Sequence, residues 1–240
     1  MDEFGAMAGV AMPGWALRRA MGRRGTAHPF AALEPGRTAL AVIDLQLGFM
    51  HERGGYTVCP AAVAAVPRVN RVAAALRLAG GMVAWVQNTH DASCLETWTV
   101  QQRMNTAEAN ARRNASMSVG GPGHALWPEL DVRPEDMRVL KRRYSAFIPG
   151  TCDLAPGLRE RGIDTVLIVG TLTNVCCESS ARDAMMLDFR TVMVSDGCAA
   201  TSEEEHNAAL AGFYATFGDV MDTAFIIERL AGAQAAQVAA

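Results

Sequence analysis

The chain alternates between short apolar runs and longer segments whose apolar residues recur at helical spacing. An uninterrupted apolar run of about four to eight residues is typical of a strand buried on both faces. Such runs predict strands at 38–45, 82–88, 136–141, 164–170 and 190–196. Helices are predicted over 60–78, 153–162, 175–189 and 202–218, and an edge strand and a closing helix are expected after 218. Strands that alternate with helices form a parallel sheet covered on both faces, so the pattern predicts an α/β fold.

The segment 89–135 breaks this rhythm because it is long and polar. A structureless loop of that length is uncommon inside a compact domain, so we expect residues 89–125 to form an insertion that serves as a lid or an oligomer contact. No internal repeat or low-complexity linker divides the rest, and 31–230 is predicted to be a single domain. It follows an N-terminal arm, 1–30, which is expected to pack on a partner subunit. An Ala-rich tail, 231–240, ends the chain.

Composition narrows the class of protein. At 240 residues, half of them hydrophobic and a fifth charged, the chain has the ordinary composition of a soluble globular domain. A net charge of −3 and a pI near 6.0 give no basic surface for nucleic acid. No apolar run approaches the roughly 18 residues of a membrane span. The acidic start, MDEF, is followed by no clean apolar stretch, so no secretory signal is predicted and we expect a cytoplasmic protein.

The six cysteines are scattered without the paired spacing of metal ligands. Reduced thiols are therefore expected, as in a cytosolic protein. Cys176 and Cys177 are adjacent, and neighbours in the chain cannot readily bond to each other without strain. An alternative interpretation is a redox protein that uses this pair, but adjacent cysteines are poorly suited to thiol–disulfide exchange.

Three reactive side chains fall where predicted strands end. Asp44 ends the first strand, Lys141 ends the third, and Cys176 opens the helix after the fourth. Each has an ordinary interpretation when it is taken alone: a capping residue, a solvated lysine and a core thiol. In an open parallel sheet, however, ligands bind outside the carboxyl ends of the strands. The shared rim therefore makes these three residues candidates for one site.

The chemistry of such a trio is coherent. A free thiol is mostly protonated at neutral pH, whereas the thiolate is the nucleophile. The helix N-terminus and Lys141 would favour a Cys176 anion. Asp44 would accept the thiol proton and return it to a leaving amine. Backbone amides at the same helix terminus would bind the oxyanion of a tetrahedral intermediate.

Residues 170–184, GTLTNVCCESSARDA, resemble the signature G-x-x-T-x-x-C-V-x-x-T-A-x-D-A of the isochorismatase-like cysteine hydrolases. The two departures are mild: Cys177 replaces the usual Val, and Ser180 replaces the usual Thr. A D-x-Q motif at Asp44 and a lysine motif at Lys141 also match, in the right order. The resemblance covers about residues 36 to 228, and it is closest to the members that hydrolyse N-carbamoyl compounds and ureides.

This resemblance implies a three-layer α/β/α fold with a doubly wound, mainly parallel sheet of about six strands. It implies a catalytic triad of Asp44, Lys141 and Cys176, in which Cys176 is the nucleophile and Cys177 is a small core residue. It also implies a cis peptide bond between Thr171 and Leu172. The expected oxyanion hole consists of the backbone N–H groups of Leu172 and Cys176.

The implied reaction is hydrolysis of a C–N bond. The substrate would be a small amide, ureide or N-carbamoyl compound, and a covalent acyl or carbamoyl intermediate would form on Cys176. Ammonia or an amine would leave, and Asp44 would then activate water. No cofactor is expected. The alternatives are a nicotinamidase-like amidase and a catalytically inactive, small-molecule-binding member of the fold.

No metal site is expected. Nicotinamidases resemble this chain in their triad but add an Asp-x-His and a second His as ligands. Here His51 and His90 follow Gln46 without an Asp-x-His, so His90 is expected to be a wall or loop residue. His124 and His206 are expected to be structural or interface residues.

Candidate substrate-binding residues flank the triad in the sequence. Gln46 and Tyr144 would hydrogen-bond a urea or amide head group, or Gln46 would hold a backbone loop and Tyr144 would be a packed aromatic residue. Phe49, Trp98 and Phe147 are expected to line an apolar wall, although buried aromatic residues are common.

The arginines of the 95–120 segment have two interpretations. Arg103, Arg112 and Arg113 would clamp a substrate carboxylate if this segment closes as a lid. At least two of the three are instead expected to lie on a solvent-exposed face of a helix. A homo-oligomer, dimer or tetramer, is also expected from the resemblance.

Overall fold

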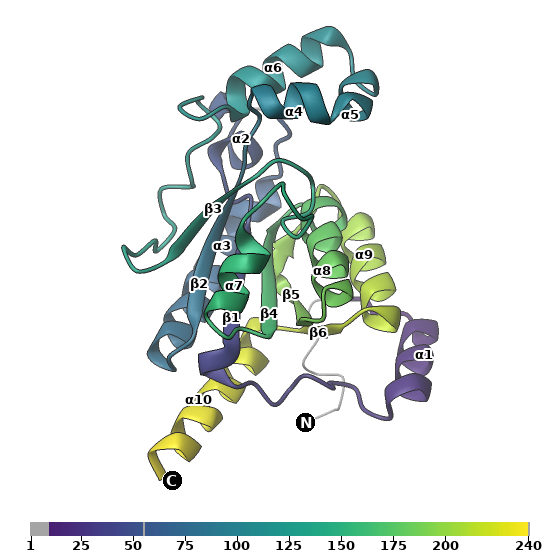
Figure 1. Cartoon of the computed structure of the whole chain (residues 1–240). Coiled ribbons are helices and arrows are strands. Elements are labelled where there is room, and N and C mark those ends of the chain that lie inside the picture. Colours follow the sequence, from purple (N-terminus) through teal and green to yellow (C-terminus); the bar gives the residue numbers. More distant parts are fainter. Residues whose placement is uncertain (1–9, 55, 240) are drawn as a thin grey trace.

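The computed structural model describes residues 10–54 and 56–239, which build one six-stranded sheet between two layers of helices (Figure 1). All strand pairs are parallel, in the order β3-β2-β1-β4-β5-β6. The strands are β1 (Thr38–Ile43), β2 (Met82–Asn88), β3 (Met137–Lys141), β4 (Thr165–Thr171), β5 (Arg190–Ala199) and β6 (Asp219–Met221). This order defines a doubly wound α/β fold, so the predicted fold class is confirmed.

The side chains of β1 alternate between two apolar cores. Leu40 and Val42 lie in the core beneath α3 (Pro60–Leu78) and α10 (Thr223–Ala239). Ala39, Ala41 and Ile43 lie in the core on the opposite face. That face is covered by α7 (Leu154–Glu160), α8 (Glu178–Met186) and α9 (Glu203–Thr216). Because both faces are buried, the strand reads as an uninterrupted apolar run in the sequence.

The register of the sheet brings the carboxyl ends of its central strands to one edge. Ile43 pairs with Val86 on β2 and with Gly170 on β4, while Asn88 pairs with Lys141 on β3. The winding direction reverses between β1 and β4, which leaves a crevice for ligands at this edge.

Gly170 is required at the point where β4 passes β1. Its φ of +120° lies in the region that favours glycine, and an added Cβ would stand 1.9 Å from the Ile43 carbonyl oxygen. No side chain fits at this position while the two strands stay paired.

The segment 89–125 folds into three short helices beyond this edge of the sheet (Figure 1). They are α4 (Ala92–Thr97), α5 (Thr99–Arg103) and α6 (Ala107–Met117). The Asp91 and Thr106 side chains cap α4 and α6 by accepting hydrogen bonds from backbone amides. The polar break in the sequence pattern therefore corresponds to capped helices rather than to an open loop.

Within the N-terminal arm, α1 (Gly14–Arg24) packs on α9 of the same chain. Ala16 meets Ala211 and Ala215, and Arg24 donates to the Gly218 carbonyl at 2.9 Å. The partner contact expected of the arm 1–30 stays a prediction, and residues 1–9 of the arm lie outside the described residues. Helix α10 continues through the tail to Ala239.

Short turns complete the described chain: η2 (Pro35–Arg37), α2 (Leu47–Met50), η3 (Glu52–Gly54) and the π-helical turn η4 (Thr173–Cys177). No helix in the described part of the chain has both the length and the apolar character that crossing a bilayer requires.

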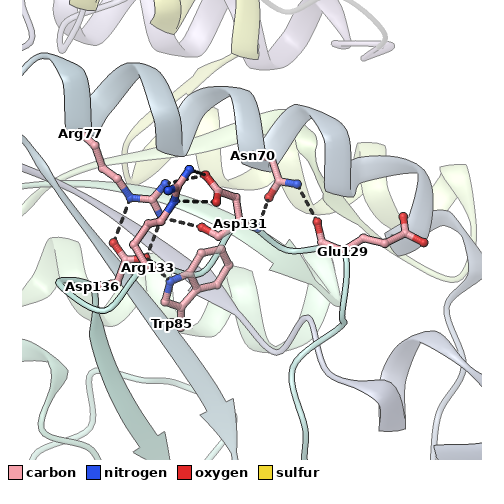
Figure 2. A network of polar contacts seen from close by, with 7 residues as sticks. All are labelled: Asn70, Arg77, Trp85, Glu129, Asp131, Arg133 and Asp136. Carbon is pink, nitrogen blue, oxygen red and sulfur yellow. Dashed lines mark hydrogen bonds and ion pairs between the residues drawn. The ribbon is translucent and has the colours of Figure 1, made fainter.

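A polar network fastens the connection before β3 to α3 and β2 (Figure 2). Arg77 on α3 pairs with Asp136 at 2.6 Å and with Asp131 at 3.2 Å. Asp136 also accepts a 2.7 Å hydrogen bond from the buried indole N–H of Trp85. Asn70 adds a hydrogen bond to the Glu129 carbonyl. Asp136 is therefore the shared acceptor of the network.

Replacing Asp136 tests this role. Asp136→Ala leaves the buried Trp85 indole without its acceptor and removes one of the two carboxylates paired with Arg77, so we expect the free energy of unfolding to fall by about 2–3 kcal/mol. Urea unfolding measures it. Glu129→Ala is the matched control, because only the backbone of Glu129 takes part, and it should cost less than about 0.5 kcal/mol. Equal effects of the two substitutions would contradict the assignment.

Candidate active site

The candidate site lies at the edge where β1, β3 and β4 end, beside the switch point of the sheet. Asp44 directly follows β1 with a positive φ of 54°, and its amide donates to the Val86 carbonyl at 3.0 Å. Lys141 is the last residue of β3. Because β2 separates β1 from β3, the long Lys141 side chain extends across the end of β2 to reach Asp44.

The structure brings the three predicted reactive side chains together. The ammonium Nζ of Lys141 lies 2.7 Å from Asp44 Oδ2 and 3.5 Å from Cys176 Sγ. It also donates to the Arg143 carbonyl at 3.0 Å. Asp44 and Lys141 are wholly buried, and Cys176 is only 5% exposed. The lysine therefore stands between a carboxylate and a thiol that are shielded from bulk water.

Cys176 is held by the turn η4, which precedes α8. The sequence predicted a continuous helix over 175–189, whereas the structure forms a π-helical turn first and begins α8 at Glu178. Ser180 donates its hydroxyl to the Cys176 carbonyl at 2.6 Å and accepts the Ala146 amide at 3.0 Å. The peptide bond between Thr171 and Leu172, just before this turn, is cis.

The two adjacent cysteines have different surroundings. Cys176 lines a cavity, whereas Cys177 is fully buried in the core beside Cys198. Burial raises the pKa of Cys177 well above its ordinary value, and the neighbouring Cys198 adds to that effect. Cys177 is therefore a core residue, and Cys176 is the thiol that a small molecule can approach.

The electrostatics of the trio follow from its burial. Burial raises the pKa of Asp44, against the opposing effect of Lys141. Burial alone would lower the pKa of Lys141, but Asp44 and Cys176 together raise it above its ordinary range. Burial also raises the pKa of Cys176, despite the opposing charge of Lys141. The charge of Lys141 therefore favours the ionised form of Asp44, while burial disfavours loss of the Cys176 proton.

A cavity of about 160 Å³ opens onto Cys176. Its wall comes from the turns after β1, the ends of β2 and β3, helix α5 and the turn η4. The lining residues are Phe49, Tyr56, Thr57, Asn88, His90, Gln101, Tyr144, Leu172, Val175 and Cys176. This volume lies below the roughly 300–1,000 Å³ of pockets for drug-sized ligands, so it suits a small compound.

Three of the predicted substrate-binding residues belong to this wall or support it. Phe49 and Tyr144 line the cavity. Trp98 lies outside the lining and packs its ring edge-on against Tyr144, with centroids 4.9 Å apart. It therefore supports the aromatic wall from behind.

The other two do not line the cavity. Gln46 accepts the Asn88 amide at 2.7 Å and donates to the Asn88 and His124 carbonyls, so its side chain holds the backbone. Of the two interpretations of Gln46, the structure favours the loop-holding one. Phe147 is buried in the core on the α7, α8 and α9 face of the sheet and packs against Phe189, with ring centroids 5.6 Å apart.

Several lining residues were not singled out from the sequence. Asn88 ends β2 on the same rim as Lys141, so the strand-end rule would have found it. Tyr56, Thr57 and Gln101 come from the segment after η3 and from α5, where no periodic pattern indicates a site. Their positions depend on tertiary packing.

His90 is part of the cavity wall, as expected. It is 6% exposed, and burial, with smaller effects of Arg113 and Lys141, lowers its pKa to about 4. The ring is therefore neutral at pH 7, and its buried Nδ1 has no protein partner. His124 and His206 serve the chain itself, through contacts with the Thr89 and Thr173 hydroxyls.

His51 stacks on Trp127 with ring centroids 6.4 Å apart. Within residues 10–54 and 56–239, no group of three or more His, Cys, Asp or Glu side chains is arranged to hold a metal ion.

The fold and this site define a class of protein. The chain belongs to the isochorismatase family, because the model of the isochorismatase domain matches residues 38–225. Members of this family are hydrolases, and this chain is a hydrolase of the isochorismatase family.

Three proteins within this class are similar to the chain in sequence or structure. Ureidoacrylate amidohydrolase RutB of Methylobacterium radiotolerans is 33% identical over 227 residues, covering 87% of each protein. A cysteine hydrolase from Pseudomonas syringae pv. phaseolicola 1448A superposes with a TM-score of 0.74 at 27% identity, covering 84% of this chain and 96% of that one. N-carbamoylsarcosine amidase from Thermoplasma acidophilum gives a TM-score of 0.61 at 26% identity, covering 78% and 96%.

The buried ion pair makes a prediction about stability. Lys141→Met leaves the Asp44 carboxylate buried without its partner, so we expect a loss of about 3–5 kcal/mol in the free energy of unfolding. The double variant Asp44→Asn/Lys141→Met removes both charges and should recover most of that loss. Urea unfolding of the single and double variants measures the coupling.

The exposed Arg138 on the same strand provides the control, since Arg138→Met should change stability by less than about 0.5 kcal/mol. A Lys141→Met variant as stable as this control would refute the pairing, and so would a double variant whose loss is the sum of the single losses.

Proposed function

We propose that this protein hydrolyses the C–N bond of a small amide, ureide or N-carbamoyl compound, with Cys176 as the nucleophile. One observation carries the proposal: the Lys141 ammonium lies 2.7 Å from the Asp44 carboxylate and 3.5 Å from the Cys176 sulfur, and that sulfur borders a cavity. A carboxylate, an ammonium and a thiol in this arrangement supply a base, a positive charge and a nucleophile.

The first half of the reaction forms a covalent intermediate. The thiol proton of Cys176 passes to Asp44, and the sulfur attacks the carbonyl carbon of the substrate. The resulting oxyanion accepts hydrogen bonds from the backbone N–H groups of Leu172 and Cys176. The C–N bond then breaks, and the nitrogen leaves as ammonia or an amine with the proton that Asp44 had taken. An acyl or carbamoyl group remains on sulfur.

The second half releases the intermediate. Asp44 takes a proton from water while the water oxygen attacks the thioester carbonyl. The C–S bond breaks, and the sulfur regains the proton as a thiol. Throughout both halves Lys141 keeps its proton, because Asp44 and Cys176 hold its pKa above the ordinary range against the effect of burial. It acts as a fixed positive charge beside the two groups that exchange the proton.

The names of the relatives agree with this chemistry. Ureidoacrylate amidohydrolase and N-carbamoylsarcosine amidase are named for the cleavage of C–N bonds next to a carbonyl. We infer the same class of reaction here. The segment 89–125 contributes His90 and Gln101 to the cavity wall, which supports its role as a lid. The cytoplasmic location and the homo-oligomer stay predictions from the sequence.

Substitution of each cysteine tests the assignment. Cys176→Ala should lower kcat by at least about 1,000-fold, because the nucleophile is lost. Cys177→Ala, one residue away in the core, should keep kcat within about threefold. Ammonia release from ureidoacrylate, N-carbamoyl amino acids, maleamate, biuret and nicotinamide provides the readout. Activity that survives in Cys176→Ala would reject the mechanism, and no hydrolysis of any amide by the folded wild-type enzyme would favour the inactive binding protein.

The pH dependence tests the role of Asp44. Asp44 must be ionised to accept the thiol proton, and burial raises its pKa above 3.8. Activity should therefore be lost as the pH falls through that raised value, so the acid limb of kcat/KM should have its midpoint above pH 3.8. Two results would contradict the assignment to Asp44. One is an acid limb of kcat/KM that shifts in His90→Gln, and the other is a midpoint at or below the ordinary Asp pKa of 3.8.

A further inference from the structure

Arg113 on α6 is a buried arginine without a carboxylate partner. Its side chain is only 1% exposed; Nη2 donates to Asn110 Oδ1 at 2.9 Å, and the guanidinium also interacts with the Tyr56 hydroxyl. Its Nε has no partner, and no ion pair within the described residues includes it. By contrast, the half-buried Arg77 pairs with both Asp131 and Asp136. An uncompensated buried charge is costly, so the position of Arg113 calls for an anion that the chain does not supply.

This charge lies behind the wall of the cavity beside Cys176. The guanidinium carbon of Arg113 is 5.8 Å from the centroid of the Tyr56 ring, which lines the cavity. After burial, Arg113 is the largest influence on the pKa of His90, and it opposes the effect of burial on the pKa of Tyr56. The field of Arg113 therefore reaches the two side chains that face the cavity.

The same stretch of wall carries polar groups with nothing to bind. The Nδ1 atom of His90 and the Oε1 atom of Gln101 are buried without a hydrogen-bond partner, and both residues line the cavity. A neutral imidazole protonated on Nδ1, the Nε2 group of the Gln101 amide and the Tyr56 hydroxyl can each donate to a bound anion, whereas Gln101 Oε1 is an acceptor and would face away from it. None of the lining residues is an Asp or Glu, and Lys141 already balances the nearby Asp44. The region around the cavity therefore keeps one unbalanced positive charge.

We propose that Arg113 makes the cavity selective for substrates that carry a carboxylate, which would bind at the wall formed by Tyr56, His90 and Gln101. This inference rests on the proposed function, because the substrate must place its scissile carbonyl at Cys176 while its carboxylate binds at this wall. Arg113 acts through the field behind this wall and is a specificity residue rather than a catalytic one. Its neighbours on the lid, Arg103 and Arg112, are exposed and take no part.

Charge-selective alkylation tests the inference without any turnover. Iodoacetate and iodoacetamide are nearly the same size, but only iodoacetate carries a carboxylate. We expect Arg113→Gln to lower the ratio of the iodoacetate rate to the iodoacetamide rate at Cys176 by about tenfold, measured by mass spectrometry of the Cys176 peptide. Arg112→Gln, the exposed neighbour, should leave the ratio unchanged. A variant damaged only in its fold would change both rates together, and an unchanged ratio in Arg113→Gln would overturn the proposal.

A matched pair of substrates tests the same claim in catalysis. N-carbamoyl-β-alanine and N-propylurea share the urea head group and the chain length, and only the first has a carboxylate. Arg113→Gln should lower kcat/KM for N-carbamoyl-β-alanine by about 10- to 100-fold, as expected for a lost contact to an ionised group, and leave N-propylurea little changed. Arg113→Lys keeps the charge and should recover part of the loss. Equal losses for both compounds would assign Arg113 a structural role.

The two experiments separate the two proposals. If the wild-type enzyme hydrolyses no amide but its alkylation ratio depends on Arg113, the anion site stands and the hydrolase function fails. If hydrolysis occurs but neither the ratio nor the substrate preference depends on Arg113, the hydrolase function stands and the anion site fails.

Discussion

The candidate site depends on the ion pair between Asp44 and Lys141, which is removed from water at the edge of the sheet. Burying two charges is costly, and the cost is offset only when the partners meet at close range, as they do at 2.7 Å. The parallel register achieves this, because β1 and β3 end at the same edge with only β2 between them. The third group, Cys176, reaches the same point from the turn after β4. The geometry of the trio is therefore a consequence of strand order.

Burial also determines how the site can work. The same exclusion of water that strengthens the pairing of Asp44 with Lys141 raises the pKa of Cys176, so the thiol is neutral at rest. A neutral thiol is protected from adventitious oxidation and needs a base to become a nucleophile. Asp44, with its own pKa raised by burial, is a better proton acceptor than an exposed carboxylate. The segment 89–125 contributes the neutral polar groups of His90 and Gln101 to the cavity wall, and the buried Arg113 of the same segment lies near Tyr56 in that wall.

The sequence was informative wherever one strong periodic rule applied. Apolar runs located five strands, and their ends located Asp44, Lys141 and Cys176, because parallel strands in a doubly wound sheet finish on one rim. The choice between Cys176 and Cys177 followed from the motif register. The sequence was uninformative where position depends on tertiary packing. Tyr56 and Gln101 reach the cavity from segments without periodicity, and an amide such as Gln46 does not reveal whether its partners are substrate or backbone. The packing of α1 on α9 gave no signal for a similar reason, since the small-residue contact of Ala16 on α9 cannot be read from composition.

The mechanism requires that burial, against the opposing charge of Lys141, holds Cys176 as a neutral thiol until a substrate enters. The most direct measurement is the ultraviolet absorbance of the thiolate, recorded as a difference between the wild-type protein and Cys176→Ala while the pH is raised from 5 to 11. We expect no Cys176-dependent thiolate signal at neutral pH, and a rise that begins only above the ordinary thiol pKa of 9.0. A thiolate signal from Cys176 that is already complete at pH 7 would contradict it.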